Sequence, residues 1–110
     1  MNSDFIIRTT KNFDKSVKKL FKKYPSLIKD LQLLKVELLN NPTAGISLGK
    51  NCYKIRMSIA SKSKGKSGGA RVITYVKIEN KLITLLDVYD KGDLEAISEK
   101  ELAALIKKAG

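Results

Sequence analysis

The stretch RVITYVKIENKLITLLDVY, residues 71–89, decides the fold. Its two halves, residues 71–79 and 81–89, are rich in the β-branched and aromatic residues typical of strands. The link between them is short enough to join two antiparallel strands. Just upstream, NCYKIRMSIA over residues 51–60 alternates apolar and polar residues with the period of a strand. Together the three segments predict an antiparallel meander.

Outside the meander the hydrophobic period changes to that of helices. Apolar residues recur at helical spacing over residues 11–24 and again over 26–40, with a proline between them, so we expect a helical hairpin. Residues 4–9, DFIIRT, predict a short strand before it. The sequence SEKE at residues 98–101 matches a capping box that opens a C-terminal helix. The order β-α-α-β-β-β-α predicts an α+β fold, with an antiparallel sheet and helices mainly on one face.

Length and composition exclude several classes of site. A chain of 110 residues allows a single domain over residues 1–110. Histidine is absent and Cys52 is the single cysteine, which excludes a Ser-His-Asp triad, a Cys-His pair and an intramolecular disulfide. No segment has the roughly 20 apolar residues of a membrane span, and the first residues are not typical of a signal peptide. We expect a cytoplasmic protein with no membrane segment, no metal and no small-molecule cofactor.

The charge is strongly positive and unevenly placed. Lys and Arg number 22 against 11 Asp and Glu, giving +11, and no acidic residue lies between Glu37 and Glu79. That interval contains eight cations: Lys50, Lys54, Arg56, Lys62, Lys64, Lys66, Arg71 and Lys77. They repel one another even when screened by salt, and a phosphate backbone would relieve the repulsion. Alternation places Lys54 and Arg56 on one strand face about 7 Å apart, near the spacing of neighbouring phosphates. A solvated basic face is the alternative interpretation.

One apparent nucleotide-binding motif lacks its structural context. Residues 60–67, ASKSKGKS, satisfy the loose phosphate-loop pattern. That motif requires a helix after the loop, whose N-terminus faces the phosphates, whereas a β-rich segment follows here. We therefore interpret SKSKGKSGG, residues 61–69, as a mobile cationic loop that can fold onto RNA.

Four short motifs occur in a definite order: CYKIR at residues 52–56, GKSGG at 65–69, RVITYV at 71–76 and VYDK at 88–91. This ordered set resembles the RelE-family toxins, and most closely the HigB-like branch of type II toxin–antitoxin systems. The resemblance implies the RelE-like α+β fold and a ribosome-dependent mRNA endoribonuclease that inhibits translation. It also implies mRNA, the ribosome and a cognate antitoxin as partners.

The resemblance further implies which residues act on RNA. Its catalytic positions are Lys54, Arg56, Arg71 and Lys91. We add as RNA-binding residues Lys50, Lys62, Lys64, Lys66 and Tyr89. Some family members carry a catalytic tyrosine near the position of Ile97, so the identity of the general base is left open, with Tyr89 as the nearest substitute or a packing residue.

The expected chemistry is attack of the RNA 2′-OH on the adjacent phosphate. Arg56 and Arg71 would stabilise the charged transition state, because arginine binds phosphate in a bidentate manner. Lys54 would act as base or proton shuttle, and Lys91 as acid or phosphate clamp. The acidic group Asp87, Asp90, Asp93 and Glu95 is interpreted as solvated or paired with Lys91, because this chemistry needs no metal.

Two alternatives remain open from the sequence. The first is a ParE-like toxin that uses the same fold to inhibit DNA gyrase. The second is a non-catalytic protein that binds RNA or the ribosome; this alternative needs the same charge but no placed catalytic residues.

Overall fold

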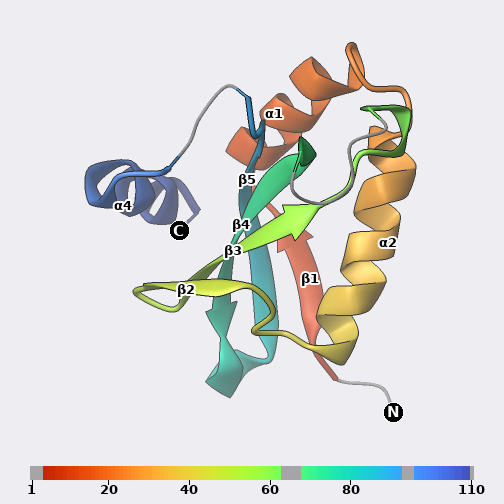
Figure 1. The fold of residues 1–110 in the computed structure, drawn as a ribbon. Coiled ribbons are helices and arrows are strands. Elements are labelled where there is room, and N and C mark those ends of the chain that lie inside the picture. Colours follow the sequence, from red (N-terminus) through yellow and green to blue (C-terminus); the bar gives the residue numbers. More distant parts are fainter. Residues whose placement is uncertain (1–3, 63–67, 93–95, 110) are drawn as a thin grey trace.

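The computed structural model describes residues 4–62, 68–92 and 96–109. In chain order the elements are β1 (Ile6–Thr9), α1 (Lys11–Phe21), α2 (Leu27–Asn40), β2 (Ile46–Gly49), β3 (Cys52–Met57), the 3-10 turn η1 (Ala60–Lys62), β4 (Ala70–Lys77), the 3-10 turn η2 (Ile78–Asn80), β5 (Leu82–Asp90) and α4 (Glu99–Ala109). The α+β class is confirmed, and the predicted helices and strands occur in the predicted order (Figure 1). The centre of the predicted mobile loop, residues 63–67, lies outside the described residues.

The strands form a five-stranded sheet in the order β1-β5-β4-β3-β2. Strands β3, β4 and β5 pair antiparallel with their sequence neighbours, which confirms the meander. Strand β1 pairs parallel with β5 and closes one edge of the sheet. The N-terminal strand therefore lies beside the last strand of the meander, which local sequence patterns do not reveal.

Strand β2 is an element that the sequence patterns missed. It forms a hairpin with β3 through a turn in which Lys50 and Asn51 have φ angles of 55° and 64°. Two successive positive φ angles are typical of a type I′ hairpin turn. Gly45, at φ 101°, precedes the strand at a point where a Cβ atom would collide with the carbonyl oxygen of Lys54. A four-residue strand without clear alternation is too short to predict from period alone.

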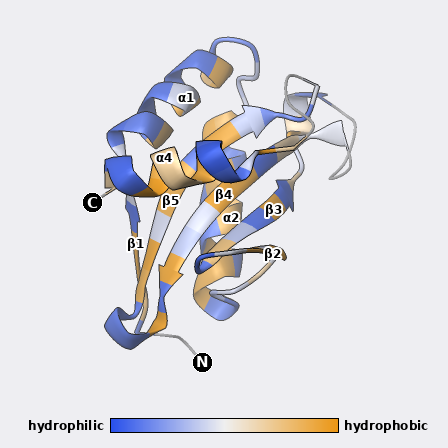
Figure 2. Cartoon of the chain, turned by 90° about the vertical axis from the view of Figure 1, so that its left-hand side faces the viewer, coloured by the Kyte–Doolittle hydropathy of each residue, from blue (hydrophilic) through white to orange (hydrophobic). Residues whose placement is uncertain are grey.

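The helices cover both faces of the sheet. Figures 1 and 2 show α2 on one side of the sheet and α4 on the other. The helical hairpin covers one face, in line with the expectation that the helices pack mainly on one face, and α4 covers the other. The reason is that β4 and β5 are apolar on both faces, so each face needs a cover to remove apolar surface from water.

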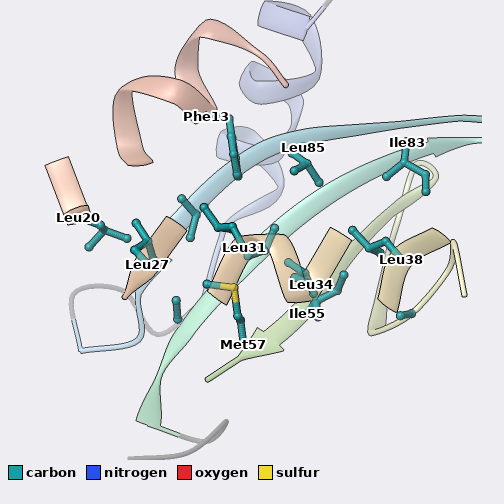
Figure 3. Close-up of a cluster of buried hydrophobic side chains, with 14 of the residues drawn as sticks. Phe13, Leu20, Leu27, Leu31, Leu34, Leu38, Ile55, Met57, Ile83 and Leu85 are labelled. Carbon is teal, nitrogen blue, oxygen red and sulfur yellow. The ribbon is translucent and has the colours of Figure 1, made fainter. Parts of the chain in front are cut away.

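The larger core cluster lies between the sheet and the helical hairpin (Figure 3). Phe13 of α1 and Leu31 and Leu38 of α2 pack towards Ile55 and Leu85 of the sheet. These side chains come from the apolar stripes that predicted the two helices. Burial of each such side chain contributes about 1.5–3 kcal/mol before conformational entropy is counted.

The second cluster lies between the sheet and α4. Cys52, Ile73 and Leu86 pack there with Leu102 and Leu105 of the helix. Burial raises the pKa of the Cys52 thiol to about 11. Cys52 is therefore a packing residue of the fold and not a reactive thiolate.

Side-chain caps fix where two of the helices begin. The hydroxyl oxygen of Thr10 accepts a hydrogen bond from the N–H of Phe13 at 3.0 Å and caps α1. The predicted capping box is confirmed, because the N–H of Ser98 donates to the Glu101 carboxylate and the N–H of Glu101 donates to the Ser98 hydroxyl. Within the described ranges, no helix is both long and apolar enough to span a bilayer.

Two leucines of α2 test the assignment of the core. Leu38 is 0% exposed, whereas Leu33 is 66% exposed on the same helix. We expect Leu38→Ala to lower the free energy of unfolding by about 2–5 kcal/mol, because it leaves a cavity under the sheet. Leu33→Ala should change it by less than about 0.5 kcal/mol. Urea denaturation of both variants measures the difference, and equal effects would contradict the packing of α2.

Candidate functional site

Three of the sequence-predicted residues lie side by side across the meander. The strand register pairs Arg56 of β3 with Arg71 of β4, and Arg71 with Tyr89 of β5. Neighbouring strands are about 4.8 Å apart, so these side chains form a row across three strands. We call Arg56, Arg71 and Tyr89 the arginine row. Lys54 lies two residues before Arg56 and shares its face of the sheet.

The row places two like charges directly opposite each other. Such a cross-strand pair is destabilising unless an anion or an acidic side chain lies nearby. Among the residues that the structure describes, neither Lys54 nor Arg56 has an acidic partner within ion-pair distance. Arg56 is exposed and Lys54 half-buried, so both can reach a ligand. The arrangement fits an anion that contacts several of these cations.

Arg71 is held more tightly than its neighbours. It is only 6% exposed, and its Nη1 donates a hydrogen bond to the carbonyl oxygen of Ala70 at 3.2 Å. A guanidinium fixed in this way loses little further conformational entropy when it binds phosphate. Its orientation is set by the protein before a ligand arrives.

Tyr89 ends the row with a buried hydroxyl. Its phenol oxygen has no hydrogen-bond partner within the described part of the chain. Burial raises the pKa of Tyr89, and the positive charge of Arg71 offsets only part of that rise. The phenol is therefore protonated at neutral pH. It can donate a hydrogen bond but is a poor general base, which argues against the substitute role considered from sequence.

An open hollow of about 420 Å³ lies beside the exposed end of the row. Lys54 and Arg56 line it together with Glu37 and Ile46. Its volume is in the range of pockets that bind small ligands. A nucleotide could lie there against the cationic edge of β3.

Lys91 follows the last residue of β5. Its backbone N–H donates to the carbonyl oxygen of Gly69 at 3.1 Å, which continues the β4–β5 pairing by one residue. The side chain of Tyr89 lies on the α4 face of the sheet, and that of Asp90 on the face of the helical hairpin. If the alternation of the strand continues by one residue, the side chain of Lys91 lies on the same face as Tyr89. The structure thus brings together Lys54, Arg56 and Arg71 on one face of the sheet, and it places the backbone of Lys91 beside Gly69, just after β5.

The lysines predicted to bind RNA do not lie together on the face of the arginine row. Lys62 donates from its ammonium to Asp90 Oδ1 at 2.6 Å, and its side chain is only 17% exposed. Lys62 is an internal counter-ion in this structure, and its assignment as an RNA-binding residue stays a prediction. Lys50 lies in the β2–β3 turn, at the opposite end of β3 from Arg56, and does not join the row. Lys64 and Lys66 lie outside the described residues.

Asp87 and Asp90, the two described members of the acidic group near the end of β5, have different partners. Asp87 accepts a hydrogen bond from Ser16 at 2.5 Å, whereas Asp90 faces Lys62 and is not paired with Lys91 as the sequence suggested. Asp93 and Glu95 lie outside the described residues. In the remainder of the chain, no three His, Cys, Asp or Glu residues are grouped as metal ligands. Ile97 is half-buried and packs in the cluster beneath α4.

Comparison with known proteins places the chain in a family. The family model described as the RelE toxin of the RelE/RelB toxin–antitoxin system matches residues 7–110. The chain belongs to the RelE toxin family. It is therefore a toxin of a toxin–antitoxin system, as the ordered motifs suggested. The narrower assignment to the HigB-like branch stays a prediction.

A solved structure agrees with the family at the level of the fold. The chain resembles an E. coli RelE toxin in the free state, in a variant with two arginines changed to alanine. The sequences are 20% identical, and the match covers 96% of this chain and 93% of the E. coli chain with a TM-score of 0.59. The likeness shows that both have the RelE fold, on which the arginine row lies.

Asp90 stabilises the RelE fold beneath this site. Burial by itself would raise the pKa of Asp90, but hydrogen bonds from Lys62 and Tyr24 outweigh that effect and lower the pKa from 3.8 to about 2. A carboxylate with a depressed folded pKa adds stability above the unfolded pKa and loses it as the pH falls through the folded pKa. The shift corresponds to about 2 kcal/mol.

The stability of Asp90→Asn should therefore depend on pH. At pH 6 we expect the free energy of unfolding of Asp90→Asn to be about 2 kcal/mol lower than that of the natural protein. At pH 2 the difference should be smaller, because Asp90 of the natural protein is then partly protonated. Urea denaturation at both pH values measures this. Asp4→Asn is the matched control, since Asp4 forms an exposed ion pair with Lys81 and should contribute less than about 1 kcal/mol. An equal deficit of Asp90→Asn at both pH values would contradict the assignment.

Proposed function

We propose that this toxin is an endoribonuclease that cleaves mRNA on the ribosome and thereby inhibits translation. The observation that carries the proposal is the direct opposition of Arg56 and Arg71 across β3 and β4. Two facing guanidinium groups are suited to a shared phosphate ligand, because arginine binds phosphate oxygens through paired N–H donors. Membership of the RelE toxin family supports the proposal independently.

The proposed reaction assigns one task to each group around the row. Lys54 acts as the base that accepts the proton of the RNA 2′-OH as the new bond from the 2′-oxygen to phosphorus forms. Arg56 and Arg71 stabilise the negative charge that develops on the phosphate. Lys91 donates a proton to the 5′-oxygen as its bond to phosphorus breaks. Tyr89 packs beside Arg71 at the end of the row with its hydroxyl buried, and contact of this side chain with RNA stays a prediction.

The chain supplies weak acid and base groups for this reaction, because it has no histidine. Weak groups act efficiently only when the substrate is already aligned for attack. The ribosome holds the codon in a fixed conformation, so we propose that cleavage depends on it. The cytoplasm, where translation takes place, is then the compartment of action, and a cognate antitoxin is the partner that keeps the toxin inactive.

Lysines outside the row support contact with a large structured RNA. The exposed residues of α1 include Lys11, Lys15 and Lys18, and together with Lys108 of α4 they line a hollow of about 590 Å³. Lysine ammonium groups on a helix surface bind phosphates without regard to sequence. Such contacts would strengthen binding to the ribosome while the arginine row acts on the message.

Single substitutions at the exposed end of the row test the proposal. Arg56→Ala and Lys54→Ala should each lower the rate of mRNA cleavage roughly 100-fold or more, because each removes a group that acts in the transition state. Primer extension on a translated message, with and without ribosomes, measures the cleavage. Lys77→Ala is the matched control, since Lys77 is an exposed cation at the far end of β4. This variant should cleave mRNA at the rate of the natural protein.

Other outcomes would favour other functions. Growth arrest with intact message and stalled replication would support inhibition of DNA gyrase. Tight ribosome binding by the natural protein without any cleavage would support a non-catalytic RNA-binding role. Equal loss of cleavage in Lys77→Ala and Arg56→Ala would show that total charge, and not the row, determines activity.

A further inference from the structure

Asp90 joins three segments that lie far apart in the sequence. Its carboxylate accepts hydrogen bonds from the hydroxyl of Tyr24 at 2.6 Å and the ammonium of Lys62 at 2.6 Å. It also accepts one from the backbone N–H of Gly92 at 3.0 Å. The residue is 4% exposed, so this is a buried carboxylate at the end of a central strand. None of the proposed catalytic roles uses it.

A gain in stability alone does not account well for the buried ion pair between Asp90 and Lys62. A buried ion pair costs desolvation energy, and apolar residues of the same volume often stabilise a protein as well or better. A buried pair that is kept instead of an apolar contact points to a role in orientation. The group that Asp90 can orient is its neighbour in the chain, Lys91.

The backbone that carries Lys91 is fixed on both sides. On one side its own N–H donates to the carbonyl oxygen of Gly69. On the other side the N–H of Gly92 is bonded to Asp90, which closes a turn around Lys91. Gly69 itself is confined, because a Cβ atom there would collide with the carbonyl oxygen of Met57. The position at which the Lys91 side chain leaves the backbone therefore depends on Asp90.

We propose that Asp90 is a positioning residue for RNA cleavage, which fixes the turn that presents the Lys91 ammonium beside the arginine row. Lys62 is its buried counter-ion, and the exposed Lys23 is a second one, with its Nζ 3.8 Å from Oδ2. The inference rests on the proposed function, in which Lys91 protonates the leaving oxygen. A displacement of about 1 Å of such a group is enough to cost a large factor in rate.

Two substitutions at Asp90 separate positioning from stability. Asp90→Ala removes the acceptor of the Gly92 N–H, whereas Asp90→Asn keeps a side-chain oxygen that can accept it. Both remove the charge that faces Lys62, and urea denaturation measures how much stability each variant loses. We expect Asp90→Ala to lower kcat at least about tenfold with KM changed by less than about twofold. Asp90→Asn should keep most of kcat.

The assay is cleavage of ribosome-bound mRNA by purified toxin at a temperature where circular dichroism shows each variant folded. Asp87→Asn is the matched control, because Asp87 is another hydrogen-bonded carboxylate of β5 and should leave kcat unchanged. A purely structural role of Asp90 predicts that activity follows stability, so equal losses in Asp90→Ala and Asp90→Asn would overturn the proposal.

A double variant tests whether Asp90 acts through Lys91. Lys91→Ala should lower kcat, and adding Asp90→Ala to it should lower kcat no further, because the group to be positioned is absent. Multiplied losses would overturn the proposal. If Asp90→Ala does not fold, Gly92→Pro removes the same N–H at an exposed site and should lower kcat in the same way.

Failure of this inference is distinguishable from failure of the proposed function. If the natural toxin cleaves no message on the ribosome, the proposed function fails, and the positioning role fails with it. If the natural toxin cleaves and Asp90→Ala remains fully active, the positioning role alone is overturned. If Lys91→Ala remains fully active, the role of Lys91 as proton donor is overturned together with the positioning role.

Discussion

The hydrogen-bonded pairing of β3, β4 and β5 holds Arg56, Arg71 and Tyr89 in one row. Two of these side chains carry the same charge, and the backbone register keeps them opposite each other despite their repulsion. A loop could relax such a pair by moving the side chains apart, but a paired strand cannot. The rest of the proposed site depends on this constraint, because Lys54 and Lys91 take their places from the same strands.

One face of the sheet both packs against α4 and carries the cations of the proposed site. Beneath α4 that face is apolar, with Cys52 and Ile73 packed against the helix. On β3 it continues into Lys54 and Arg56, which form no ion pair with the acidic side chains that the structure describes. The opposite face is covered by the helical hairpin and supplies most of the core (Figure 3). The packed parts keep the strands rigid, and a rigid sheet holds its cations ready for phosphate without further reorganisation.

Much of the fold and part of the site could be predicted from local patterns. The alternation that predicts β3 also places Lys54 and Arg56 on one face, and Ser98 with Glu101 predicts the start of α4. Strand β2 could not be predicted, because Ile46–Gly49 is too short to show a period and its pairing depends on a turn with positive φ angles. The position of α4 on the other face could not be predicted, since a helix pattern shows that one side of the helix is apolar but not which surface that side will meet.

The sequence by itself determined the strand and helix periods, the excess of positive charge and the ordered motifs of the RelE family. Each of these depends on residues close together in the chain. Only the tertiary structure decided which cations are available: Arg56 lies opposite Arg71, whereas Lys62 is bonded to Asp90. Lys62 and Asp90 are 28 residues apart, and a long lysine can turn either to solvent or to a buried carboxylate. Which of the two a lysine contacts depends on the segments that the fold brings beside it, and local sequence patterns do not contain this information.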